Sequence, residues 1–191
     1  WDIYKSDTYW GGLLSGKDQL EEVIAANTTG VTSMYSMFYQ CSHLTSVPLF
    51  DTSSVTNMEG MFRYCSSLTS IPLFDTSLVT KMAKMFESCI KLVSVPLLDT
   101  SLVTNMNSMF DGCNRLTSVP LFDTSSLTSM GRMFYGCYAV ESGALALYQQ
   151  VSTQANPPTY HGSAFTNCGA DTTTGRAELS QIPSSWGGTG A

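Results

Sequence analysis

The sequence predicts a repeat solenoid, a chain that winds through stacked coils of equal length. The pair Met-Phe returns every 24 residues along the middle of the chain, and single Cys and Pro residues return at the same interval. Because three series share one register, each coil is predicted to be one 24-residue unit. The series are Met37-Phe38, Met61-Phe62, Met85-Phe86, Met109-Phe110 and Met133-Phe134; Cys41, Cys65, Cys89, Cys113 and Cys137; and Pro48, Pro72, Pro96 and Pro120.

Each unit contains Leu-x-x-Val-Pro-Leu, which matches the strand pattern of leucine-rich repeats, Leu-x-x-Leu-x-Leu. We therefore expect one short strand per coil, with the Leu44, Val47 and Leu49 positions facing the core. Proline at the strand centre removes a ladder hydrogen bond, so this sheet should be weakly paired or reduced to a short bridge. An apolar pattern at i, i+3, i+6 and i+7 follows and predicts a short helical or 3₁₀ return segment. Its members in one coil are Val55, Met58, Met61 and Phe62.

Three segments are expected along the chain. Residues 1–19 form an N-terminal cap, residues 20–140 form five 24-residue leucine-rich-like repeats, and residues 141–191 form a C-terminal cap. Strong helix formers over residues 144–154 predict a helix inserted in this last segment, and two prolines stop it. Phe165-x-x-Cys168 then marks a degenerate last repeat. Such atypical ends cover the apolar surface that an open solenoid would expose.

The cysteines in register allow three interpretations. Equivalent residues of neighbouring coils lie about 4.8 Å apart, a distance that a disulfide tolerates. The first interpretation is therefore a disulfide ladder, and the second is a metal site made of thiolates. The third interpretation is a column of buried, reduced thiols that act as small hydrophobic side chains. Because the sequence has no Cys-x-x-Cys pair and no His in register, a metal site is poorly supported. We favour the column of buried, reduced thiols and expect Cys168 to be a buried, reduced thiol as well.

A second column is acidic and would stack like charges. The Asp-Thr-Ser turn of each unit predicts carboxylates that cap nearby backbone amides. Calcium bridging between coils is the alternative, since hard oxygen ligands suit that ion. However, the glycine-rich Asp repeat of calcium-binding β-helices is absent, and we favour turn capping without a metal. The column consists of Asp51, Asp75, Asp99 and Asp123, and Thr56, Thr80, Thr104 and Thr128 are expected to form a hydroxyl ladder along the same edge.

The residue after the last core leucine of each strand is the best candidate for binding. Alternation along a strand would turn this position to the opposite, concave face. There it would form an exposed apolar stripe flanked by Thr and Ser, which is typical of a contact surface. A stacked ladder packed against proline, with no partner, is the alternative. The stripe is Phe50, Phe74, Leu98 and Phe122.

Composition excludes several other classes of function. The chain has 191 residues and a formal net charge of −6, so it lacks the basic stripe that nucleic-acid binding requires. No run approaches about 18 apolar residues, the length that spans a membrane. His43 lies in a variable surface stretch, and His161 has no base or orienting group nearby in sequence. With no nucleophile elbow, zinc motif or phosphate loop either, we expect no enzyme activity, cofactor or metal.

The block Met-Phe-x-x-Cys-x-x-Leu-Thr-Ser-Val-Pro-Leu-Phe-Asp-Thr-Ser-x-Val-Thr-x-Met resembles the repeat of BspA-like leucine-rich-repeat bacterial surface proteins, including the mycoplasma-lipoprotein type. The likeness covers about residues 20–140. It implies a secreted or cell-surface, non-enzymatic recognition or adhesion module that binds a protein or glycan through its strand face. It transfers no binding residue. The alternative is a structural or host-recognition subunit of a larger surface or phage assembly, including contacts with other copies.

Overall fold

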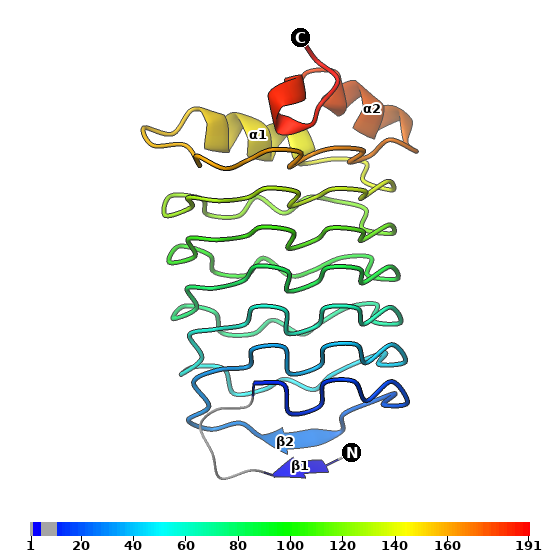
Figure 1. Cartoon of the computed structure of the whole chain (residues 1–191), viewed down its shortest axis with the longest axis vertical. Coiled ribbons are helices and arrows are strands. Elements are labelled where there is room, and N and C mark those ends of the chain that lie inside the picture. The colour runs from blue at the N-terminus through cyan, green and yellow to red at the C-terminus, as the bar shows by residue number, and fades with distance from the viewer. Residues whose placement is uncertain (1, 5–10) are drawn as a thin grey trace.

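The structure is a computed structural model that describes residues 2–4 and 11–191. Between β2 (Ala25–Asn27) and α1 (Ala144–Ser152) the chain winds through coils stacked along one axis (Figure 1). At one end, β1 (Asp2–Tyr4) pairs in parallel with β2. At the other end lie α1, α2 (Thr173–Leu179) and a 3₁₀ turn, Ser184–Trp186. Residues 1 and 5–10 of the N-terminal cap expected over 1–19 fall outside the described residues.

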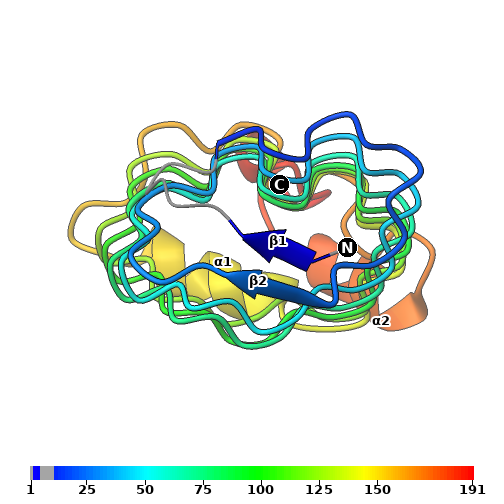
Figure 2. The same ribbon diagram turned by 90° about the horizontal axis from the view of Figure 1, so that it is seen from below.

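One long side of every coil, here called the turn wall, is made of consecutive turns. It comprises residues 34–41, 58–65, 82–89, 106–113 and 130–137. Alternate N–H groups donate to the next coil, as from Ser36 to the Glu59 carbonyl and from Phe38 to the Met61 carbonyl, both at 2.9 Å. Ser36 and Gln40 adopt a left-handed backbone conformation, with φ of 50° and 62°, where the chain reverses so that these N–H groups point toward the next coil. The repeated reversals give the notched edge in Figure 2.

The predicted helical return segment is therefore wrong. An α-helix bonds each N–H to the carbonyl four residues earlier, and a 3₁₀ helix bonds each N–H to the carbonyl three residues earlier. Here alternate N–H groups cross to a neighbouring coil, and only those between them bond three residues back, as Met37 does to Met34. Within the described residues the first helix is α1, which falls in the stretch where a helix was expected. The turn wall also continues beyond the five repeats. Residues 11–17 donate to residues 35–39, and residues 160–166 accept from residues 130–136.

The opposite side, here called the extended wall, comprises residues 44–50, 68–74, 92–98 and 116–122. It is almost free of β pairing: the bridges on it are Glu22 with Ser46 and Ser118 with Ser142. The prediction of a strand in each coil is wrong, while the short bridge expected near proline forms beside Pro48 and Pro120. Inward positions recur every third residue, at Leu44, Val47 and Phe50. A three-residue period is that of polyproline II, which proline favours, and not of a pleated strand.

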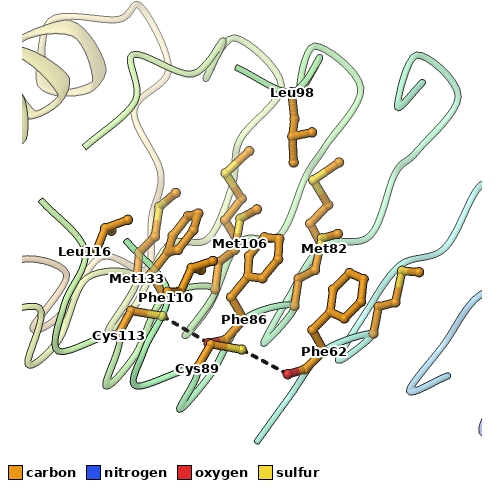
Figure 3. Close-up of a cluster of buried hydrophobic side chains, with 14 of the residues drawn as sticks. Phe62, Met82, Phe86, Cys89, Leu98, Met106, Phe110, Cys113, Leu116 and Met133 are labelled. Atoms are coloured by element: carbon orange, nitrogen blue, oxygen red, sulfur yellow. Dashed lines mark hydrogen bonds between the residues drawn. The ribbon is translucent and has the colours of Figure 1, made fainter. Parts of the chain in front are cut away.

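The core between the two walls is a set of columns parallel to the stack. Phenylalanine rings of successive turn walls lie face to face, with centroids 5.2–5.9 Å apart. Methionine, cysteine and leucine side chains fill the space around them, as Figure 3 shows. On the extended-wall side the hydroxyl of Thr76 donates to the Asp99 carbonyl at 2.8 Å, and Thr52 and Thr100 repeat the contact. Each such bond fastens one coil to the next.

Candidate binding surface

The predicted stripe does not form a surface. Phe50, Phe74, Leu98 and Phe122 are at most 3% exposed, and Figure 3 shows Leu98 directed into the core. The rings of Phe50 and Phe74 stack at 5.8 Å, between centroids, as part of the core columns. The binding-stripe prediction is therefore wrong, because the segment follows a three-residue period that turns this position inward.

The preceding residue of each unit is exposed instead. Sequence reasoning placed it in the core, since the leucine-rich-repeat pattern assigns it an inward leucine. The exposed fractions of these side chains are 68%, 62%, 63% and 54%. Because one leucine stands on each coil at the same place, they form a row parallel to the stack, here called the leucine row. Its members are Leu49, Leu73, Leu97 and Leu121.

The proline before each leucine is the signal that could have found this row. Proline removes the N–H that a strand would use and fixes φ near the polyproline II value. Counting three residues back from Phe74 gives Ile71 and then Leu68, and all three are buried. Leu73 does not fall on this three-residue series, so its side chain points to solvent. Leucines with about half of their side chain exposed also occur at Leu78 and Leu102, beyond the Asp-Thr-Ser turn.

The aspartate column runs beside the leucine row and is exposed along its whole length. Oδ1 of Asp75 accepts from the Ser77 hydroxyl at 2.7 Å and from the Ser77 N–H at 3.0 Å. These hydrogen bonds lower the pKa of the Asp75 carboxyl, while the negative charges of its neighbours raise it. Every member keeps a lowered pKa through its own serine contacts, so the column is ionised at neutral pH. We call Asp51, Asp75, Asp99 and Asp123 the aspartate row.

Two shallow hollows lie along these rows. One, of about 410 Å³, is lined by Leu73, Leu97, Asp75 and Asp99 with the turn between them. The next, of about 510 Å³, is lined by Leu97, Leu121, Asp99, Asp123 and Gln150 of α1. Gln150 also donates to the Phe122 carbonyl at 2.7 Å, which fixes the helix against the last coil. The surface therefore has an apolar side, an anionic side and one end closed by α1.

The cysteine column lies in the core and away from these rows. All six thiols are free, and burial raises the pKa of Cys41 to about 11 and that of Cys89 well above its ordinary value. The protonated thiols of the in-register cysteines donate to backbone carbonyls one coil earlier, as from Cys89 to Phe62 at 3.0 Å (Figure 3). The same carbonyls also accept from a backbone N–H, as the Phe62 carbonyl does from Cys65 at 3.0 Å, so each thiol adds a second hydrogen bond that links two coils. The donors are Cys41, Cys65, Cys89, Cys113 and Cys137.

In the part of the chain that the structure describes, neither histidine lies beside a group of catalytic or metal-binding side chains. The His43 ring contacts the Asp18 carbonyl at 2.7 Å on the surface, and the His161 ring stacks on Trp186 at 3.8 Å. Over residues 2–4 and 11–191, His, Cys, Asp and Glu side chains form no cluster of three or more with metal-binding geometry. Of the threonines expected to form a ladder, Thr56, Thr80 and Thr128 donate their hydroxyls to a carbonyl of the preceding coil, as Thr80 does to Thr56 at 3.2 Å.

Comparison with known proteins gives a family and a fold. A family described as "Mycoplasma protein of unknown function, DUF285" matches residues 12–95 and again residues 66–156. The crystal structure of a leucine-rich repeat protein from Eubacterium ventriosum ATCC 27560 is similar, with a TM-score of 0.54 and 16% sequence identity. The match covers 87% of this chain and 42% of that one, and it confirms a leucine-rich-repeat type of fold. No curated protein matches the chain. Its described helices are all too short or too polar to cross a membrane.

Proposed function

This chain belongs to the family described as "Mycoplasma protein of unknown function, DUF285", and on that premise we propose that it is a non-catalytic module that binds a partner protein. The leucine row is the contact surface. The observation that carries the proposal is that four leucines, each more than half exposed, repeat at one place on successive coils. Apolar side chains scattered over a surface are ordinary, whereas an aligned group beside a charged rim is typical of an interface.

A partner would gain mainly by covering these leucines. Full burial of an exposed leucine side chain is worth about 1.5–3 kcal/mol. Because each member of the row is 54–68% exposed, covering it gains more than half of this, and the row can supply the apolar centre of an interface. The aspartate row would form its polar rim and orient the partner. We place the module outside the cell or on its surface, since the likeness to BspA-like proteins implies that location. The aliphatic row favours a protein over a glycan, because sugar rings are more often stacked on aromatic faces.

The test is a selection of binders from an unbiased peptide display library, run beside a glycan array. We expect binders that are lost when two leucines of the row become polar, in the variant Leu73→Ser/Leu97→Ser. The control is Ile90→Ser/Val93→Ser, which changes two apolar side chains that are 42% and 43% exposed and lie outside the leucine row. Equal loss in both variants, or glycan binding that survives both, would contradict the proposal.

The structural alternative makes a different prediction in the same preparation. A subunit of a surface or phage assembly would form a closed oligomer or a filament, and would bind nothing in the two screens. Light scattering of the purified chain measures this directly. We expect a monomer, because two copies that met through this surface would oppose their aspartate rows.

A further inference from the structure

We propose that the partner presents a basic amphipathic α-helix, which lies along the leucine row parallel to the stack of coils. Its apolar stripe covers the leucines, and a stripe of Lys and Arg runs along the aspartate row. This inference rests on the proposed function, since it names the chemistry of the partner at the same surface. Three properties of the surface support it: its repeat distance, its charge and its closed end.

The repeat distance is close to one turn of an α-helix. Parallel bridges join successive coils, as between Asn57 and Lys81, so equivalent residues of neighbouring coils lie about 4.8 Å apart. An α-helix rises about 5.4 Å per turn, so one side chain per turn can meet one leucine per coil with a drift of about 0.6 Å at each coil. An extended strand repeats its facing side chains about every 6.7 Å and drifts by about 1.9 Å at each coil.

The charge selects a basic partner. Each aspartate lies two residues beyond its leucine, or about 7 Å along an extended chain, so the two rows run side by side. The described residues give Asp75 and Asp99 no ion pair, and the negative charges of Asp51 and Asp99 both act on Asp75. Lysine and arginine relieve this repulsion with their charged ends. Their aliphatic stems can lie against leucine at the same time.

The ends of the surface set the length of the helix. The leucine row covers four coils, from Leu49 to Leu121, which corresponds to contacts at i, i+3 or i+4, i+7 and i+11, or about 12 residues of helix. Beyond Leu121 the larger hollow is closed by Gln150 of α1. A helix can therefore enter from the N-terminal side and end against α1. The two hollows lie at consecutive coils, where side chains of consecutive turns can occupy them.

A second copy of this chain does not supply such a helix. Among the described residues, α1 has no Lys or Arg, and α2 has only Arg176. The partner is therefore a different protein whose helix carries four or so basic residues along one side of an apolar stripe. Recognition of amphipathic helices by apolar grooves commonly reads anchors at i, i+3, i+4 and i+7.

The experiment uses three fluorescent peptides of about 15 residues, long enough for four helical turns. The first has a leucine stripe beside a lysine stripe, the second has glutamate in place of each lysine, and the third has two prolines inserted into the first pattern. Fluorescence anisotropy on the whole chain measures their affinities. We expect the lysine peptide to bind at least about tenfold more tightly than the other two. Its affinity should fall as salt rises, because exposed charges are screened.

The variant Asp75→Asn/Asp99→Asn tests the aspartate row without breaking its turns. Asparagine keeps the Oδ1 atom that accepts from the N–H of Ser77 and Ser101, so the coil should fold as before. We expect this variant to weaken the lysine peptide about tenfold, a change of about 1.4 kcal/mol. The control Glu59→Gln/Glu141→Gln removes two carboxylates elsewhere and should change little. Circular dichroism and the melting temperature confirm that both variants fold.

The possible failures are distinct. Equal binding of the lysine and glutamate peptides, full binding of the proline peptide, or an equal loss in both double variants would overturn the basic helix. If no peptide binds but library binders still need Leu73 and Leu97, the partner has another shape and the proposed function stands. If Leu73→Ser/Leu97→Ser keeps every binder, the proposed function itself is wrong.

Discussion

The turn wall and the extended wall come from the same 24-residue repeat but use their polar groups in opposite ways. On the turn wall, alternate N–H groups cross to the next coil, and charged side chains are paired, as Arg63 is with Glu87 at 2.9 Å and Arg132 with Asp111 at 2.8 Å. On the extended wall the crossings are few, such as that from Thr117 to the Val93 carbonyl at 3.1 Å. The proline of each coil offers no N–H there at all.

The difference separates stability from recognition. The turn wall uses most of its backbone groups and the side chains of Arg63 and Arg132 internally, so fewer of its polar groups are available to a partner. The extended wall leaves leucine side chains and carboxylates exposed in aligned rows. A rigid wall of hydrogen bonds behind it keeps these rows at a fixed spacing, which lowers the entropy that binding must overcome. Phe74 and Leu73 are neighbours on the extended wall, one buried and one exposed, and they give the sharpest test of this separation between stability and recognition.

The largest effect is expected at Phe74 and its neighbour Leu73. Phe74→Ser should lower the free energy of unfolding by about 3–5 kcal/mol, since it empties a buried aromatic position. Leu73→Ser should change it by no more than about 0.5 kcal/mol, because that side chain is exposed. Urea denaturation of both variants measures the difference. Similar values for the two residues would mean that the extended wall has no fixed inside and outside.

This pair also shows how far the sequence could predict the fold. The 24-residue period and the core positions of Met, Phe and Cys follow from spacing. The helix near residue 144 follows from its strong helix formers. The orientation of Phe74 does not, because an apolar run with proline in it fits both a two-residue and a three-residue period. A slip of one residue moved the whole candidate site from the exposed leucines to the buried phenylalanines.

The sequence predicts a helical segment in place of the turn wall for a related reason. Apolar residues at i, i+3, i+6 and i+7 mark one face of a helix, but consecutive turns that reverse direction can bury the same positions. The evidence for turns was glycine at positions such as Gly60 and Gly112, where the backbone is left-handed. Other coils place Lys84 or Ser88 at left-handed positions, which hides the pattern in a single sequence.

A medium effect is expected when these left-handed positions change. Gly112→Ala should cost about 1 kcal/mol, because alanine is strained at its φ of 75°. The new Cβ would lie 3.5 Å from the Ser88 hydroxyl, so steric overlap adds little. Gly162→Ala is the matched control, since that glycine has open space and no left-handed backbone. Thermal unfolding of the two variants would show no difference if the turn wall did not need left-handed residues.

The smallest effect concerns the aspartate row in acid. Hydrogen bonds from Ser77 lower the pKa of Asp75 below its ordinary value of 3.8. The folded state therefore holds its proton less tightly than the unfolded state, and the stability this contributes is present above about pH 4 and lost as the pH falls further. We expect a small decrease of the melting temperature from pH 5 to about pH 3, and less decrease in Asp75→Asn/Asp99→Asn. Calcium at neutral pH should leave the melting temperature unchanged, because serine groups already satisfy Oδ1. A rise of several degrees with calcium would instead make the row a cation site and weaken its role in holding a basic helix.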